Sequence, residues 1–398
     1  ILKGFFCLLK MFNRIISGAR NNKYETLLFL SAFVSSLLIV VEHYDFEFLG
    51  SLPFSHRAFV MNMFFKRELN LDGFWEAAGF DVIKYQGHYF PAFPPGAAFF
   101  AFPFYFMEQV FSWFFVRIAG PMNGTLSLFL ESVSFSMPTI LSFSLSMVLL
   151  YKLCRYFKVG RAASVVSSWS LAFTTFAFSY TGQINNHIIA MFVLLLANYL
   201  LLTKDLGRGK LAFLCGLLFG VAPNIEYPTV LYFLPALVYL GFRELSKDQL
   251  KHGELIAFLK RKKGMLAHFA IGFLASLSFV FIYNFLLFGN PLTFPESLVT
   301  TGGGAEQGRI GIDFATPLHL GLFGNLFSPL KGIFFHMPLA ILAVLGFAKL
   351  LKSKFRSEGV LFSSYFLMML VLYSAWRDWM GGWTFGPRFL ISTLPYLF

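Results

Sequence analysis

Apolar runs of about twenty residues recur along the chain, and each is long enough to cross the hydrocarbon of a bilayer as a helix. Helices in soluble cores keep one polar face, so this pattern indicates membrane-spanning helices. We therefore predict an all-α fold, a polytopic transmembrane helical bundle of about eleven spans. The predicted spans lie at 25–41, 95–116, 128–150, 162–180, 184–202, 211–222, 227–242, 265–288, 332–350 and 360–375, with a last one starting at Phe389.

Basic segments predict which way the bundle faces. Lys and Arg are concentrated at 152–161, 204–210, 243–263 and 349–356. Because basic loops stay on the cytoplasmic side, the loops at 42–94, 289–331 and 376–388 are predicted to face outside. One conflict remains, because the pattern has two candidate spans between Pro94 and Lys152, where an odd number is needed. Either 95–116 is re-entrant or 152–161 breaks the rule.

Composition supports a membrane protein and argues against a nucleic-acid-binding one. Hydrophobic residues make up 57% of the 398 positions and charged residues 13%. The net charge of +12 comes from short loops between spans, as topology signals do. We predict a basic interfacial segment at 1–24 and one transmembrane domain at 25–398. The chain stops inside an apolar run, so we expect that its C-terminal part is missing.

The long first outer loop carries carboxylates beside the predicted membrane surface. Asp45 and Glu47 follow the first span, and Asp81 lies later in the loop. Long ordered loops are more often functional than passive. A carboxylate here can act as a general base toward an acceptor hydroxyl; the alternative is a loop that only needs charges to stay wet. We also predict short surface helices, for example 56–68 with Phe59, Met63 and Phe64 on lipid.

Other outer residues point to ligand binding. His88 and Tyr89 precede Pro94-Pro95-Gly96, and Tyr89 can stack on a sugar or lie in an aromatic belt at the headgroups. Lys331, at the outer start of a span, either anchors its helix or binds a lipid phosphate. His187 and Glu226 each lie at the start of a span, where ionisable groups are functional candidates, with capping or packing as the alternative.

Residues 376–388 form the densest local signal in the chain. Trp379 and Trp383 offer flat faces for sugar rings, and the Gly381-Gly382 pair allows close backbone approach. Arg388 can hold a phosphate with two parallel hydrogen bonds. An aromatic belt at the membrane interface would explain the Trp residues but not the glycine pair or the Gly-Pro-Arg sequence.

A family resemblance follows from these features. A first span, an acidic outer loop and then Gly87, Tyr89, Pro94, Pro95 and Gly96 resemble the polyprenyl-phosphate-dependent membrane glycosyltransferases of the GT-C superfamily. Within it, the chain is most similar to the protein O-mannosyltransferase and aminoarabinose-transferase-like group (the glycosyltransferase 39 type).

The resemblance implies a function and a location. Residues 25–398 would be a GT-C-like domain that transfers a hexosyl or pentosyl group from a polyprenyl-phosphate donor to a lipid, glycan or protein acceptor. The active site would lie on the outer face of the plasma membrane, among membrane lipids, in cell-envelope glycosylation.

The resemblance also assigns site residues. It puts the catalytic base at Asp45, with Glu47 and Asp81 as rivals, although relatives often have an adjacent Asp-Glu pair that Phe46 separates here. The residues that we expect to bind the donor are Arg388, Lys331, His187, His88, Tyr89, Trp379 and Trp383. Some relatives use a divalent cation and others do not; the sequence has no clear metal-ligand set, so no cofactor is assigned and a divalent cation stays open.

Two other classes compete with an enzyme: a transporter or flippase of a lipid-linked sugar, and a non-catalytic membrane subunit. A transporter is expected to show repeated halves and polar residues near the membrane midplane. The sequence has no internal repeat, and its polar residues concentrate at the predicted outer face. These two observations favour the glycosyltransferase.

Overall fold

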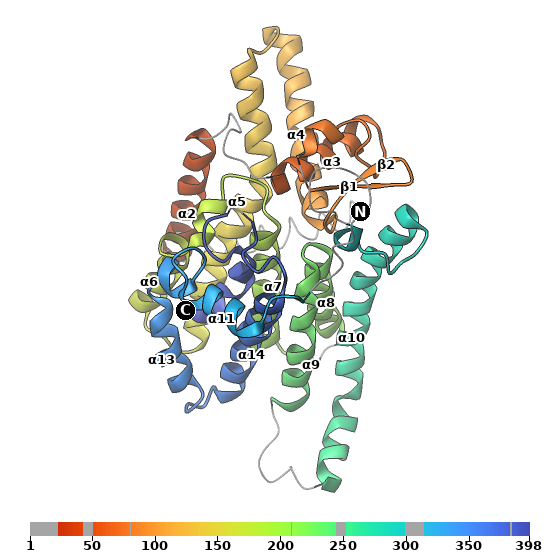
Figure 1. The fold of residues 1–398 in the computed structure, drawn as a ribbon. Helices are drawn as coiled ribbons and strands as arrows, with labels where there is room; N and C mark the ends of the chain where they lie inside the picture. Colours follow the sequence, from red (N-terminus) through yellow and green to blue (C-terminus); the bar gives the residue numbers. More distant parts are fainter. Residues whose placement is uncertain are drawn as a thin grey trace.

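Long apolar helices dominate the computed structural model, which describes residues 23–42, 51–79, 81–207, 209–243, 252–298, 314–382 and 384–398 (Figure 1). Six of the described helices are long and apolar enough to cross a membrane. The predicted helical membrane bundle is therefore confirmed, whereas the number of spans stays a prediction. The six are α2 (Lys23–Glu42), α4 (Gly96–Ala119), α5 (Gly124–Tyr156), α7 (Asn186–Thr203), α10 (His252–Phe288, apolar from Lys260) and α14 (Arg356–Ala375).

Shorter elements connect and surround these helices. The α-helices are α3 (Ser51–Phe65), α6 (Arg161–Phe173), α8 (Gly209–Val221), α9 (Phe233–Phe242), α11 (Leu318–Phe327), α12 (Ile333–His336) and α13 (Ala340–Leu350). The 3-10 helices are η1 (Trp75–Ala78), η2 (Phe176–Tyr180), η3 (Ala222–Asn224), η4 (Tyr227–Tyr232), η6 (Pro295–Leu298) and η7 (Arg388–Leu397). Strands β1 (Val82–Tyr85) and β2 (His88–Pro91) form one antiparallel hairpin.

Several predicted spans are shorter or broken in the structure. The predicted span 332–350 is divided into α12 and α13 around Pro338, because proline lacks an amide proton and clashes with the preceding turn. The predicted span 162–180 contains α6, which ends at Phe173 and is followed by a 3-10 turn. The segment from Phe389 is part of the 3-10 helix η7, which contains Pro395.

The packing of α2 against α5 bears on the crossing conflict in the sequence. Lys152 Nζ lies 2.9 Å from Glu25 Oε2 near one end of the pair. Near the other end, Ser136 donates a 2.8 Å hydrogen bond to the carbonyl of Gly182, which packs against Ile39. The first part of α5 therefore extends beyond α2 and forms a projecting hairpin with α4 (Figure 1). Helix α4 leads away from the basic end, and α5 alone returns to it.

The first outer loop is packed more tightly than the sequence suggested. Phe59 on α3 is 0% exposed, so this helix does not lie with that side chain on lipid as predicted. Arg57 holds α3 to α5 through a 2.9 Å ion pair with Glu131. The β1–β2 hairpin, which pairs Val82 with Pro91 and Tyr85 with His88, is a small departure from the predicted all-α fold.

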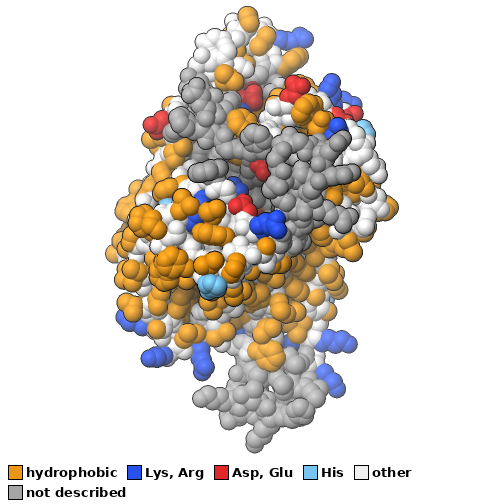
Figure 2. All heavy atoms as spheres, in the orientation of Figure 1, with side chains coloured by type: hydrophobic (Ala, Val, Ile, Leu, Met, Phe, Trp, Pro, Cys, Tyr) orange, Lys and Arg blue, Asp and Glu red, His pale blue; other side chains and the backbone are white. Residues whose placement is uncertain are grey.

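The surface reflects the membrane-protein composition. In Figure 2, hydrophobic side chains cover the middle of the visible face, as a lipid-facing belt requires. The acidic side chains visible on that face lie in its upper half, whereas Lys and Arg also line its lower rim. His187, at the start of α7, lies at the opposite end of that helix from the basic segment 204–210.

Candidate functional site

The loop 376–388 turns back on itself through three glycines. Gly381, Gly382 and Gly386 have φ values of +65°, +71° and +65°, a region that L side chains avoid. A Cβ built at Gly381 would lie 3.2 Å from Arg388 Nε and 3.0 Å from the Phe389 ring. The close approach expected of the glycine pair is therefore made, at Gly381, by the Arg388 end of the same loop.

Lys331 reaches this loop from the turn between α11 and α12. Its side chain is among the largest fully buried ones, and Nζ donates to the carbonyl and, at 3.0 Å, to the hydroxyl oxygen of Thr384. Burial and then the nearby charge of Arg388 lower the pKa of Lys331 to about 8. Thr384 in turn donates 3.1 Å to the carbonyl of Gly381, which packs beside Arg388 Nε, so Lys331 contacts the same part of the loop as Arg388.

Arg388 begins η7 at the end of the same loop. Its guanidinium lies over the ring of Phe389, with Cζ 5.3 Å from the ring centroid. Its Nε is buried and has no hydrogen-bond partner among the described residues. A buried guanidinium donor without a partner costs free energy, so this group is suited to receive an acceptor atom from a ligand.

Two carboxylates complete the group of charges. Partial desolvation raises the pKa of Asp378, while the backbone of Gly382 and the cations Arg388 and Lys331 oppose that rise. The charge of Asp81 contributes to the upward shift, so Asp81 also lies in range. The peptide oxygen of Asp81 accepts hydrogen bonds from Ser55 Oγ (3.0 Å) and the Ala92 amide (3.1 Å). The group thus draws on three segments distant in sequence: the turn with Lys331, the loop with Asp378 and Arg388, and the segment with Asp81.

A buried polar cluster contacts this group. His187 Nδ1 lies 3.0 Å from Glu226 Oε1, and each side chain is 4% exposed. Tyr373 donates a 2.7 Å hydrogen bond to the same oxygen. Phe389, next to Arg388, stacks on the Tyr373 ring at 4.4 Å and meets the His187 ring edge-on at 5.7 Å. His187 therefore lies beside the Arg388 segment, as a buried partner of Glu226.

His56, on α3 within the predicted first outer loop, is also buried. Burial, and then the charge of His187, lower the pKa of His56 to about 3, so its imidazole stays neutral at physiological pH. Its ring packs 4.2 Å from that of Phe93, and its Nε2 has no hydrogen-bond partner among the described residues. A lone histidine within a helix gives no sequence signal for such a position.

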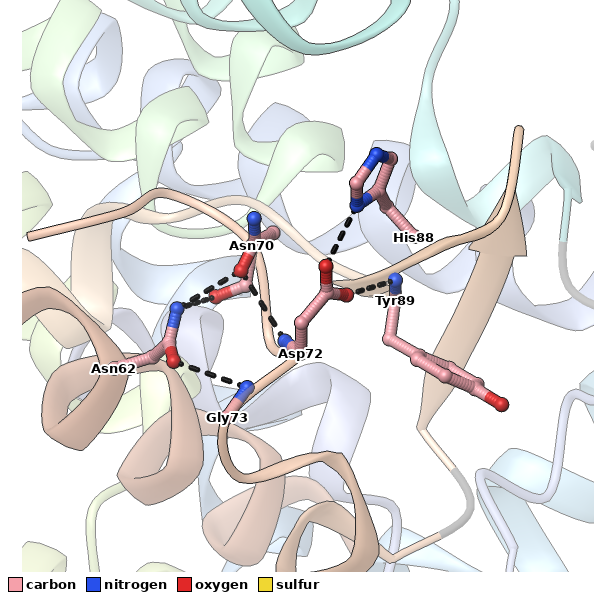
Figure 3. A network of polar contacts seen from close by, with 6 residues as sticks. All are labelled: Asn62, Asn70, Asp72, Gly73, His88 and Tyr89. Carbon is pink, nitrogen blue, oxygen red and sulfur yellow. Dashed lines mark hydrogen bonds and ion pairs between the residues drawn. The ribbon is translucent and has the colours of Figure 1, made fainter. Parts of the chain in front are cut away.

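His88 and Tyr89 belong to a separate network (Figure 3). His88 Nδ1 lies 2.6 Å from Asp72 Oδ2, and the amide of Tyr89 donates 2.8 Å to Asp72 Oδ1. Tyr89 stacks on Trp75 at 4.5 Å, which occupies one face of its ring. Figure 3 also shows Asn62 bonded to Asn70 and Gly73, which closes the turn that carries Asp72. These contacts position the β1–β2 hairpin, and no contact within the described residues joins them to Arg388.

Of the remaining predicted site residues, the structure describes Trp379 but not the other three. Trp379 packs against α11, since a Cβ built at Gly324 would lie 2.2 Å from its ring. Asp45, Glu47 and Trp383 lie outside the described residues, so their roles stay predictions. Asp378 belongs to the same group of ionisable residues, although the sequence analysis did not assign it a role. Its position inside 376–388 was the sequence feature that could have indicated one.

A metal site is not evident in the part of the chain that the structure describes. No three His, Cys, Asp or Glu side chains among these residues are grouped closely enough to hold an ion. The described side chains thus supply no ready ligand set for the divalent cation that the resemblance left open.

Comparison with known families found a match in the middle of the chain. A family model described as dolichyl-phosphate-mannose-protein mannosyltransferase matches residues 122–260. The matched segment, less than half of the chain, includes His187 and Glu226 but not Asp81, Lys331 or Arg388. No curated protein matches the chain. Together with the helical bundle, the family match supports a membrane glycosyltransferase of the GT-C superfamily.

Proposed function

We propose that this protein transfers a sugar from a polyprenyl-phosphate donor to a hydroxyl acceptor at the outer face of the membrane. The observation that carries the proposal is the contact of Lys331 with the loop that ends at Arg388. Lys331 Nζ donates to Thr384, and Thr384 donates to the carbonyl of Gly381, which packs beside Arg388 Nε. A site for such a reaction needs fixed cations for a phosphate and a carboxylate for a proton.

The cations are suited to a phosphate. Lys331 and Arg388 destabilise each other's charge, and burial adds to that cost at Lys331. An incoming phosphate would relieve the repulsion and offer an acceptor to the unpartnered Nε of Arg388. Strongly perturbed charges that are held together in this way are more typical of functional sites than of surface anchors.

The chemistry requires a single proton transfer and a single displacement. A carboxylate takes the proton of the acceptor hydroxyl, and the freed oxygen attacks the anomeric carbon of the sugar. The bond from that carbon to the donor phosphate breaks, and its electron pair leaves with the phosphate oxygen. Negative charge therefore grows on the phosphate, where Arg388 and Lys331 stabilise it.

The base is assigned among three carboxylates. The resemblance favours Asp45, with Glu47 beside it in sequence; Asp81 is the third candidate, and its charge acts on Asp378 of the Arg388 loop. Trp379, Trp383, His88, Tyr89 and His187 remain proposed donor contacts. Of these, His187 has direct support from its packing on Phe389.

The location of the site is part of the proposal. The chain would lie in the plasma membrane, with the loops at 42–94 and 376–388 facing outside. A thiol introduced at Ser51 or Gly382 should react with a membrane-impermeant maleimide in intact cells, and one at Ser246 should not. The reverse labelling pattern would contradict this orientation.

Reconstitution of the full chain tests the activity. Proteoliposomes receive a polyprenyl-phosphate sugar and an acceptor extract from the source cell envelope, with Arg388→Ala as the matched inactive variant. The proposal predicts glycosylated acceptor and an equal amount of free polyprenyl phosphate. Movement of the intact lipid-linked sugar between leaflets, without cleavage, would instead identify a flippase.

A further inference from the structure

A cavity lies at the basic end of the bundle, away from the candidate donor site. Its volume is about 830 Å³, and it opens between the start of α2, the end of α5, the start of α6 and the end of α7. The charged residues that line it are Lys23, Glu25, Lys152, Arg155 and Arg161. Four cations thus surround one carboxylate in the described lining.

The internal contacts of the cavity leave most of this positive charge unbalanced. Glu25 lies 2.9 Å from Lys152, so the single carboxylate of the lining is already engaged by one cation. Arg155 uses one guanidinium nitrogen on the carbonyl of Val159. Lys23 and Arg161 are exposed and form no ion pair or hydrogen bond with other described residues. Such a concentration of cations attracts an anion.

Neutral groups in the lining add hydrogen-bond donors for the same anion. Tyr151 and Tyr24 stack at 6.3 Å, and Tyr199 contributes a hydroxyl from the end of α7; the Thr203 hydroxyl is used internally, since it donates 2.6 Å to the carbonyl of Tyr199. Arg161 is also the first residue of α6, a helix whose N-cap Gly160 provides no side-chain cap. The first amide groups of that helix therefore have no side-chain acceptor, and they can donate to an anion at the N-terminus.

The walls beside the cavity are apolar and face outward. Leu27 of α2 lines the cavity, and Leu30 and Val34 continue the same exposed stripe, each 51% exposed. Helix α6 adds Val166 at 60% exposed, and Trp169 holds α6 to α2 by donating 3.2 Å to Ser31 Oγ. A charged cavity that opens beside such a surface fits an amphiphile better than a free ion.

We propose that this cavity binds the phosphate headgroup of an anionic membrane lipid, with the acyl chains along α2 and α6. Basic pockets between transmembrane helices recognise lipid phosphates in this way, and each Lys or Arg near the surface adds to the attraction. The site is independent of the proposed glycosyl transfer, because Tyr199 and Thr203 line it at the end of α7, whereas His187 lies at the start of that helix. It would hold the protein in an anionic leaflet.

Native mass spectrometry of the purified full chain tests the proposal. The protein in neutral detergent is mixed with phosphatidylglycerol or, separately, with phosphatidylcholine, and bound lipid is counted. Wild type should retain phosphatidylglycerol preferentially. The double variant Lys23→Glu/Arg161→Glu should retain it at least about tenfold more weakly, because two favourable contacts become repulsive.

A charge-matched variant separates the cavity from the general field of the basic end. Lys349→Glu/Lys352→Glu changes two exposed lysines outside the cavity by the same amount and should retain the lipid as wild type does. Lys23→Gln/Arg161→Gln repeats the test should charge reversal impair folding. Equal loss in both Glu pairs, or full retention in both cavity variants, would overturn the proposal. Displacement of bound lipid by millimolar inorganic phosphate would overturn the lipid assignment in favour of soluble phosphate.

Discussion

His187 on α7 and Glu226 before η4 form a buried contact, with Nδ1 3.0 Å from Oε1. Both residues lie inside the family-matched segment, and Tyr373 of α14 adds a hydrogen bond to the same carboxylate from outside it. The cluster therefore ties the matched segment to the C-terminal helices. Through Phe389 it also supports the position of Arg388.

This contact predicts a graded loss of stability. Glu226→Ala leaves the buried Tyr373 hydroxyl without its acceptor and removes the polar neighbour of His187, and each buried polar group left unpaired costs about 1–3 kcal/mol. Tyr373→Phe removes one hydrogen bond and should cost about 1 kcal/mol. Thermal unfolding in detergent should rank the stabilities as wild type, Tyr373→Phe and Glu226→Ala. A Glu226→Ala protein as stable as wild type would show that the contact contributes nothing.

The glycine pair provides a matched test of the loop geometry. Gly381→Ala and Gly382→Ala both place a side chain at positive φ, which costs roughly 1–2 kcal/mol. A Cβ at 381 also meets Arg388 Nε at 3.2 Å, whereas a Cβ at 382 meets open space. Donor affinity, measured by binding of a lipid-phosphate analogue, should therefore fall several-fold more in Gly381→Ala. Equal affinities in the two variants would show that the contact between residue 381 and Arg388 does not affect donor binding.

Lys331 predicts a pH dependence for the donor. Its pKa of about 8 means that it is charged at pH 7 and loses its proton as the pH rises through 8. Because kcat/KM reports the free enzyme, kcat/KM for the donor should fall between pH 7 and 9. Lys331→Arg should remove this fall, since arginine stays protonated. An unchanged pH profile in Lys331→Arg would assign the fall to another group.

The catalytic base is identified by neutral, isosteric changes. Asp45→Asn should lower turnover by about 10²–10⁴-fold, the range for a lost general base, with donor binding retained. Glu76→Gln, an exposed carboxylate in the same loop, serves as the control and should behave as wild type. Full activity in Asp45→Asn, with loss in Glu47→Gln or Asp81→Asn, would move the role to that residue.

The sequence predicted the class of fold and the segments of the site better than their contacts. The hydrophobic periodicity predicted the long helices because length and composition alone decide membrane insertion. It did not anticipate α11 inside a predicted loop or the division at Pro338, where local packing and a single proline decide. The hairpin of α4 and α5 has the same apolar signal as two spans, so composition could not show where α4 points.

The site shows the same division. Arg388, Lys331 and Asp81 were selected by residue type and position, and the structure joins Lys331 to the Arg388 loop through Thr384. Pairings such as His187 with Glu226 depend on how α7 meets η4, which no local pattern records. His88 was selected by the same reasoning as Lys331, yet its contact with Asp72 places it in the hairpin network. Residue type can suggest a role, but the packing of the side chain is needed to distinguish a residue that can contact a ligand from one that holds the fold together.

The donor affinity of Arg388→Lys tests the central claim most directly. Lysine keeps the charge but cannot make the two parallel hydrogen bonds of a guanidinium, so a phosphate-binding Arg388 predicts clearly weaker binding of a polyprenyl phosphate. Arg377→Lys in the same loop is the matched control and should bind as wild type does. Arg388→Ala should nearly abolish transfer while the protein still folds. If Arg388 only anchors its segment at the headgroups, Arg388→Lys will bind the donor with wild-type affinity, and that result would contradict the account.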